Sequence, residues 1–157
     1  MAEEFYAAGE SRYNAALSDF AGYYEQLLDL AKGIDLKPGR VPANEFWLID
    51  DDRVIGRSSL RHHLTTALEL EGGHIGYDIR PAERRKGYGT LILELTLEKA
   101  KDRGLRKVLV TCDSDNTGSA KIIERNGGRF IGQAISLNTG IESFRFEIEI
   151  LSKNKDA

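Results

Sequence analysis

Residues 74–100, HIGYDIRPAERRKGYGTLILELTLEKA, predict a strand, a loop and a helix in that order. At the start, Ile75 and Ile79 alternate with polar or small residues, which is the pattern of a strand. Pro81 ends this strand because proline has no N–H group to donate to a sheet. From position 90 onward, apolar residues recur every three or four positions, as on one face of a helix. The rest of the chain is arranged around this unit.

The loop inside this unit, RRKGYG at residues 84–89, has the composition of an anion site. Its two glycines let the backbone turn tightly and bring N–H groups close to a ligand. The helix that follows begins with free N–H groups and the positive end of its dipole, and three cations precede it. We therefore predict that this loop binds phosphate groups.

The composition of the chain excludes several classes of protein. With 157 residues, 41% apolar and 30% charged, it is predicted to form one soluble globular domain over 1–157, with a frayed polar tail at 152–157. A net charge of −3 argues against a general nucleic-acid binder, and no apolar run approaches membrane-spanning length. The single cysteine excludes an internal disulfide framework and suits a reducing compartment, so we expect a cytoplasmic protein.

Other elements are predicted on both sides of the central unit. Residues 2–32 are predicted to be helical, in two pieces broken near Gly9. A β-hairpin is predicted at 46–60, and the continuous apolar character of its first strand, 46–49, predicts burial on both faces. The elements predicted after the central helix are a strand at 107–112, a short helix to about 126, and two strands at 129–137 and 142–151 joined at 138–140.

Two motifs in this arrangement resemble a known family. The spacing Arg84-x-x-Gly87-x-Gly89 resembles the pyrophosphate-binding loop of the Gcn5-related N-acetyltransferases (the GNAT superfamily), written Q/R-x-x-G-x-G/A. In that family the loop joins the fourth strand to the third helix and binds the diphosphate of acetyl-coenzyme A. Asn116 and Ser119 match the family pattern N-x-x-S/A after its fifth strand. The stretch GGHIGYDIRPAERRKGYG at 72–89 also resembles a bacterial branch of predicted acetyltransferases.

This resemblance covers roughly residues 10–150 and implies a fold. The GNAT fold is an α/β (α+β) fold, with a mixed central sheet flanked by helices. A GNAT chain normally begins with a strand, whereas this chain begins with a helical pattern, so the first strand is expected to be missing. The segment 46–49 would then lie at an open edge, and such an edge favours pairing with a second copy. We therefore expect a homodimer as one possibility.

The resemblance also implies acetyl-coenzyme A as the cosubstrate and residues that would bind it. The strand at 74–79 would run along the pantetheine arm, and the loop at 84–90 would hold the diphosphate. Asn116 and Ser119 would contact the pantetheine arm or the phosphates. The residues expected to bind the cosubstrate are Tyr77, Asp78, Ile79, Arg84, Arg85, Lys86, Gly87, Tyr88, Gly89, Thr90, Asn116 and Ser119.

The catalytic groups follow the family less closely. Many GNAT enzymes use a tyrosine to protonate the departing thiolate, at a position that is occupied here by Ile123, which has no proton to give. Tyr77 is then the candidate acid, although a packed aromatic is the simpler reading of it. A base that takes a proton from an amine could be His74, whose neutral imidazole suits physiological pH. Glu71 and Asp113 are the alternatives.

No metal site is predicted. His62 and His63 are adjacent on a predicted strand, so their side chains would point to opposite faces and make a poor pair of metal ligands. Cys112 lies in an apolar strand and is interpreted as a small buried hydrophobic residue, not a nucleophile.

The resemblance therefore implies an N-acetyltransferase that moves an acetyl group from acetyl-coenzyme A to a primary amine. The sequence does not identify the acceptor. The alternative is a non-catalytic sensor or interaction module that binds coenzyme A on the same fold, which the missing tyrosine would allow. A dinucleotide site is disfavoured because the third glycine of that motif is absent and cations precede the loop.

Overall fold

The computed structural model describes residues 1–136 and 140–150. The elements, in chain order, are α1 (Ala2–Ala7), α2 (Asn14–Ser18), α3 (Phe20–Lys32), β1 (Ala43–Asp50), β2 (Arg53–Arg61), α4 (Thr66–Leu70), β3 (Ile75–Ile79), the 3-10 helix η1 (Pro81–Glu83), α5 (Tyr88–Asp102), β4 (Lys107–Asp113), α6 (Thr117–Arg125), β5 (Arg129–Ile135) and β6 (Glu142–Glu149). The turn predicted at 138–139, the strand ends predicted at 137 and 151, and the tail predicted at 152–157 lie outside the described residues.

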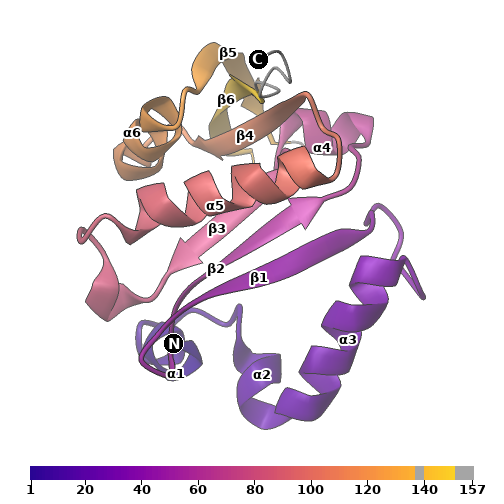
Figure 1. Ribbon diagram of the computed structural model, residues 1–157, viewed down its shortest axis with the longest axis vertical. Coiled ribbons are helices and arrows are strands. Elements are labelled where there is room, and N and C mark those ends of the chain that lie inside the picture. Colours follow the sequence, from indigo (N-terminus) through magenta and orange to yellow (C-terminus); the bar gives the residue numbers. More distant parts are fainter. Residues whose placement is uncertain (137–139, 151–157) are drawn as a thin grey trace, which may run out of the picture.

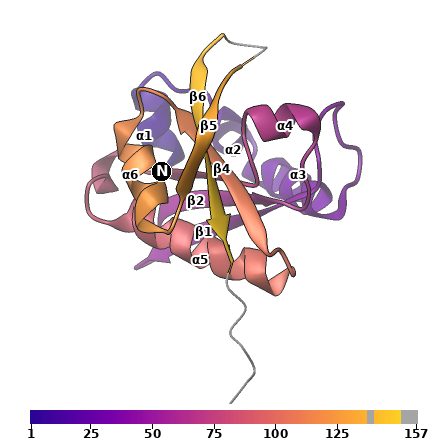
Figure 2. The ribbon, with the colours of Figure 1, turned by 90° about the horizontal axis from the view of Figure 1, so that it is seen from above.

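The strands form one six-stranded sheet in the order β1-β2-β3-β4-β6-β5. Only β3 and β4 pair in parallel among these strands, and every other neighbouring pair is antiparallel. Helix α5 crosses one face of the sheet, and α1 to α3 lie on the other (Figures 1 and 2). The sheet begins at β1, and residues 1–42, which are all described, contain helices and loops but no strand. The predicted α/β fold without a leading strand is therefore confirmed.

The core lies between the sheet and α5. Leu93 and Ala100 on α5 are fully buried, as the helical pattern predicts, whereas Glu94 is exposed. The hydroxyl of Thr96, also on this buried face, hydrogen-bonds to Ser58 of β2 (2.7 Å), so neither buried polar group is left without a partner. The core residues are Leu60, Ile75, Leu93, Ala100, Val108, Val110, Cys112, Ile123, Phe146 and Ile148.

The N-terminal region forms three helices where two were predicted. The break near Gly9 is present, but the chain breaks again at Asp19, whose side chain accepts a hydrogen bond from the Gly22 N–H (3.0 Å) and so begins α3. Helix α1 is anchored by Phe5, which is buried, and by Glu4, which pairs with Arg80 just after β3. These contacts bring the start of the chain close to the loop before α5.

Two predictions about the first hairpin are wrong. Strand β1 is not buried on both faces, because it is the edge of the sheet; Trp47 is half-buried and Ile49 is 58% exposed. His62 and His63 do not lie on a strand, because β2 ends at Arg61. His62 instead hydrogen-bonds through Nε2 to the side chain of Asn44 (2.7 Å).

The connection at 61–73 contains a helical turn that the sequence did not indicate, α4. The Thr65 hydroxyl caps this five-residue helix by accepting a hydrogen bond from the Leu68 N–H (3.3 Å). Among the helices of the described residues, none is long and apolar enough to cross a membrane.

Candidate functional site

A cleft of about 590 Å³ opens where β3 and β4 separate. Within the described residues the two strands share a single registered pair, Ile75 with Val110, and then spread apart toward the start of α5 (Figure 1). One edge of β3 therefore faces the cleft beyond Ile75, while its other edge is paired with β2. The cleft is lined by Arg12, Tyr77, Asp78, Ile79, Arg84, Arg85, Gly87, Gly89, Thr90, Asn116, Gly118, Ser119, Lys121, Ile122 and Arg125.

The loop that was predicted to bind an anion lies at one end of this cleft, and its two glycines serve different purposes. Gly87 precedes the first turn of α5 with φ 90°, a left-handed conformation that favours glycine. It has no side chain to cap the helix, and nothing lies within 4 Å of the position a Cβ would take. At Gly89 a Cβ would approach Ile122 Cδ1 to 2.6 Å, so this glycine permits close packing of α5 and α6.

The cations of this loop differ in their contacts. Arg84 donates from Nε to the Ile79 carbonyl (3.2 Å) and lies 3.8 Å from a carboxylate oxygen of Glu10. Lys86 forms an ion pair with Glu83 (2.8 Å) and does not line the cleft. Arg85 lines the cleft, is exposed, and makes no ion pair or side-chain hydrogen bond with any described residue. Of the three cations in this loop, Arg85 is therefore the one for which protein carboxylates compete least with a bound anion.

Tyr77 closes the inner part of the cleft. It lies on β3, and its hydroxyl is 2.7 Å from Ser119 Oγ on α6. Ser119 is held in turn by Asn116, which begins α6 and accepts a hydrogen bond from the Ser119 N–H (3.0 Å). Burial raises the pKa of Tyr77 to about 12, against the opposing effect of the Ser119 hydrogen bond, so the hydroxyl is protonated at neutral pH.

His74 lies just before β3 and does not line the cleft. Its Nδ1 accepts a hydrogen bond from the Leu109 N–H (2.9 Å), so a neutral ring carries its proton on Nε2. Burial, and then the charge of Arg61, lowers the pKa of His74. A further proton could bind only at Nδ1, so the ring would have to give up the bond to Leu109, and this geometry does not favour the predicted role as base.

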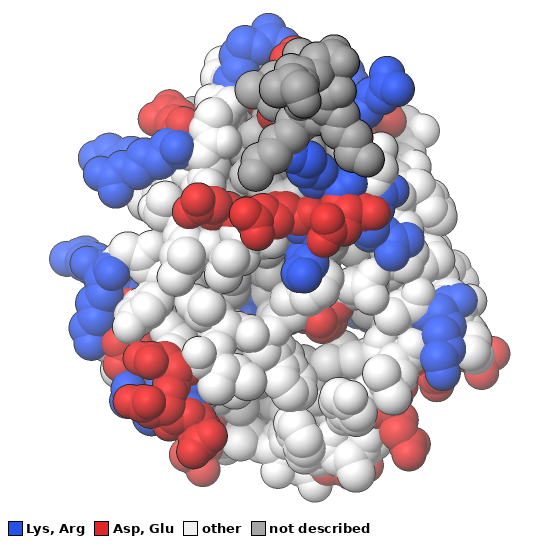
Figure 3. Space-filling view, in the orientation of Figure 1, with Lys and Arg blue, Asp and Glu red and all other residues white. Residues whose placement is uncertain are grey.

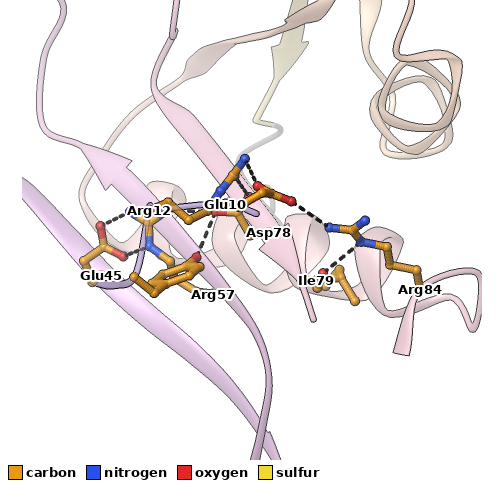
Figure 4. A network of polar contacts seen from close by, with 8 residues as sticks. Glu10, Arg12, Glu45, Arg57, Asp78, Ile79 and Arg84 are labelled. Atoms are coloured by element: carbon orange, nitrogen blue, oxygen red, sulfur yellow. Dashed lines mark hydrogen bonds and ion pairs between the residues drawn. The ribbon is translucent and has the colours of Figure 1, made fainter. Parts of the chain in front are cut away.

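A network of charged side chains lies beside the cleft, on the face of the sheet covered by the N-terminal helices (Figure 4). Asp78 is at its centre and accepts hydrogen bonds from Arg12, from the Tyr13 hydroxyl (2.9 Å) and from Arg57 (3.1 Å). Arg57 also donates twice to Glu45, at 2.5 Å each. Burial would lower the pKa of Arg57, but the hydrogen bond to Glu45 raises it overall. Each buried charge in this network has a partner.

Glu10 links this network to the phosphate loop. It contacts Arg12 at 2.5 Å and Arg84 at 3.8 Å, and Figure 4 shows it between the two arginines. The guanidinium groups of both arginines also lie over the Phe5 ring, 5.3 and 5.6 Å from its centroid. The N-terminal segment therefore contacts the candidate site directly.

Several cleft residues were not among the sequence predictions. Lys121, Ile122 and Arg125 line the cleft from α6, and Arg12 lines it from the N-terminal segment. Lys121 and Arg125 are four residues apart on α6, which follows the N-cap residue Asn116, so the spacing could have indicated that these two cations share one face of the helix. Nothing local in the sequence indicates that Arg12 approaches Asp78.

The remaining candidates are distributed around the cleft. Glu71 and Asp113, the alternative bases, do not line it, and neither do Lys86 and Tyr88. Ile123 is fully buried in the core. Burial, and then the neighbouring Asp113, raises the pKa of Cys112, which keeps this buried thiol protonated.

In the described part of the chain, no group of three or more His, Cys, Asp and Glu side chains could hold a metal ion.

Comparison with known proteins agrees with this geometry. A family model described as an acetyltransferase (GNAT) domain matches residues 14–129. Among solved structures, yncA from Salmonella typhimurium, solved with its cofactor acetyl-CoA, has a TM-score of 0.60 at 14% identity, over 85% of this chain and 73% of that chain. The microcin self-immunity acetyltransferase MccE, in complex with acetyl-CoA and AMP, has a TM-score of 0.61 at 18% identity, over 85% and 71%.

A further similar structure is a GNAT-family acetyltransferase from Bacillus anthracis, with a TM-score of 0.55 at 23% identity, over 68% of this chain and 66% of that chain. At these identities the structures support the fold alone. A search of curated protein sequences finds no match.

Proposed function

The chain belongs to the GNAT acetyltransferase family, and from this premise we propose that it transfers the acetyl group of acetyl-coenzyme A to a primary amine. The observation that carries the proposal is the cleft between β3 and β4, which combines an uncapped helix start, cations and a half-buried tyrosine. Acetyl-coenzyme A matches this combination because it has a diphosphate at one end and a thioester at the other.

In this proposal the diphosphate binds the N–H groups at residues 87–89, whereas the Thr90 N–H already donates to the Gly87 carbonyl (3.1 Å). The start of α5 lacks a side-chain cap, so its first N–H groups are available to an anion. Arg84 and Arg85 would add charge-assisted hydrogen bonds. The pantetheine arm would lie along Tyr77, Asp78 and Ile79, where the edge of β3 has no strand partner on the cleft side among the described residues.

The transfer requires that an amine nitrogen attack the thioester carbonyl. The new C–N bond forms, the C–S bond breaks, the amine loses one proton, and the thiolate gains one. Tyr77 is the protein group whose position, in the cleft lining and in hydrogen-bond contact with Ser119, suits contact with the sulfur. With a pKa of about 12 it is a weaker acid than a thiol with a pKa of about 8.5. We therefore expect Tyr77 to stabilise the thiolate by a hydrogen bond, and the proton to come from solvent.

The proposal is tested by incubating the protein with acetyl-coenzyme A and a panel of primary amines while free thiol is measured. Turnover with any of the amines supports the enzyme. Saturable binding of acetyl-coenzyme A without turnover would support the alternative of a non-catalytic coenzyme-A-binding module instead. Tyr77→Phe removes the hydroxyl but keeps the ring, and should lower kcat by about tenfold, or about 1.4 kcal/mol, with little change in acetyl-coenzyme A affinity. An unchanged kcat would remove Tyr77 from the mechanism.

We also propose that the exposed edge of β1 is the surface through which two copies pair. This edge strand has no neighbour beyond it in the described sheet, and Ile49 on it is 58% exposed. Helix α3 covers part of the same strand, with Phe20 and Tyr24 packed 5.9 and 6.3 Å from the ring of Trp47. Light scattering at rising concentration tests this, and a mass that stays monomeric would show that α3 protects the edge sufficiently.

A further inference from the structure

The cations that line the cleft fall into two groups. Arg12 and Arg84 are ion-paired with carboxylates of the N-terminal segment or β3. In contrast, Arg85, Lys121 and Arg125 make no ion pair or side-chain hydrogen bond within the described ranges 1–136 and 140–150. Three cations that have no partner among the described residues therefore line one concave site.

Two of these three cations are placed on α6, opposite the phosphate loop. Lys121 and Arg125 are four residues apart, so they project from the same side of the helix. The end of α6 is tied to the start of α5, because Asn126 Nδ2 donates to the Thr90 carbonyl (3.2 Å). Figure 3 shows basic side chains along the left margin of the molecule, over α6 and over the loop before α5.

Two unpaired cations at this spacing are unfavourable for the empty protein. Like charges four residues apart on a helix destabilise it slightly, and charges that face a cleft focus the potential there. The loop N–H groups, Arg84 and Arg85 are sufficient donors for a diphosphate. Lys121 and Arg125 therefore have the right charge and position for a second, separate phosphate group.

We propose that Lys121 and Arg125 form a second phosphate subsite, which binds the 3′-phosphate on the ribose of coenzyme A. This inference rests on the proposed function, because it requires that acetyl-coenzyme A bind in the cleft. The subsite makes the protein selective for coenzyme A over carriers that have the pantetheine arm and diphosphate but lack the ribose phosphate.

The test compares the affinities of coenzyme A and 3′-dephospho-coenzyme A by calorimetry. Wild type should bind coenzyme A about tenfold more tightly. Lys121→Gln/Arg125→Gln should abolish this preference while keeping the affinity for dephospho-coenzyme A within about twofold. The matched control is Lys99→Gln/Lys101→Gln, which removes the same charge from the last turn of α5, outside the cleft lining, and should keep the preference.

The possible outcomes separate the two claims. Equal affinity of wild type for both ligands would overturn the subsite but leave the proposed function intact. An equal loss of affinity for both ligands in the double variant would assign the two cations to the diphosphate and also overturn the subsite. If wild type bound neither ligand, the proposed function and the subsite would both fail.

Discussion

The charged network around Asp78 and the cations that line the cleft use the same kinds of side chain for different purposes. On the side of the N-terminal helices, Arg57 is three-quarters buried and its guanidinium is shared by Glu45 and Asp78. On the cleft side, Arg85 is exposed and has no anionic partner among the described residues. A buried charge needs a partner within the protein, whereas an exposed cation in a cleft is solvated and can bind an anionic ligand. We infer that the first region maintains the fold and the second binds the cosubstrate.

The largest expected effect is a loss of stability when Arg57 is removed from the network around Asp78. Arg57→Met leaves the Glu45 and Asp78 carboxylates without their shared donor, so the free energy of unfolding should fall by about 3 kcal/mol. Urea denaturation measures this. Arg85→Met, the matched control, should change stability by less than about 0.5 kcal/mol. Equal losses in the two variants would contradict the distinction between the regions.

The next effect concerns the cleft side and compares two adjacent residues. Arg85→Gln should weaken acetyl-coenzyme A binding by about tenfold, or about 1.4 kcal/mol, because it removes an unpaired cation from the phosphate loop. Lys86→Gln should change the affinity by less than about threefold, because Lys86 pairs with Glu83 outside the cleft lining. Calorimetry measures both, and a larger loss in the Lys86 variant would reverse this assignment.

Gly89 is a less informative position for such a test. The sequence suggests that its role is to admit phosphate, but a side chain there would also collide with Ile122 and disturb the packing of α5 against α6. Substitution of the exposed arginines of the loop changes the charge at the site without disturbing this packing.

A smaller effect is expected where the two regions meet. Glu10 competes with the diphosphate for Arg84, so Glu10→Gln should tighten acetyl-coenzyme A binding by about two- to threefold, within the range of an exposed ion pair. Glu3→Gln removes the same charge from α1 without touching the network, and should leave the affinity unchanged. Weaker binding in the Glu10 variant would show that this carboxylate supports the site.

The smallest effect is a pH dependence of stability that comes from His74, outside the cleft lining. Burial lowers the pKa of His74 below its ordinary value of 6.5, so the unfolded chain takes up the proton first as pH falls. Stability is therefore fully present above pH 6.5 and declines below it. His74→Asn keeps an acceptor for the Leu109 N–H and removes the titration, so its unfolding free energy should vary less with pH in that range. An unchanged pH dependence would contradict this.

The sequence predicted the strand, loop and helix at the centre because each of these signals is local. The alternation around Ile75, the stop at Pro81 and the glycine at 87 all lie within one short stretch. The same locality explains why the family loop could be found from the spacing of three residues. These features determine where the cleft lies, and the structure brings most of the predicted cosubstrate residues into its lining.

What the sequence missed depends on contacts between distant segments. The apolar run at 46–49 indicated burial on both faces, whereas the missing first strand indicated an open edge, and the strand order confirms the edge. The partners of Asp78 come from three segments, and no periodicity connects Arg12 or Arg57 to it. The second role of Gly89 required knowledge of where Ile122 lies.

The most direct test of the central claim is to locate acetyl-coenzyme A on the protein. In a titration followed by amide ¹H–¹⁵N NMR, we expect the largest shift changes at residues 87–90 and 116–119. These two segments contain the cleft-lining residues Gly87, Gly89, Thr90, Asn116, Gly118 and Ser119. The amides of β1 and α3 should change little. Shift changes that cluster on β1 or α3, with the loop before α5 unaffected, would contradict the account.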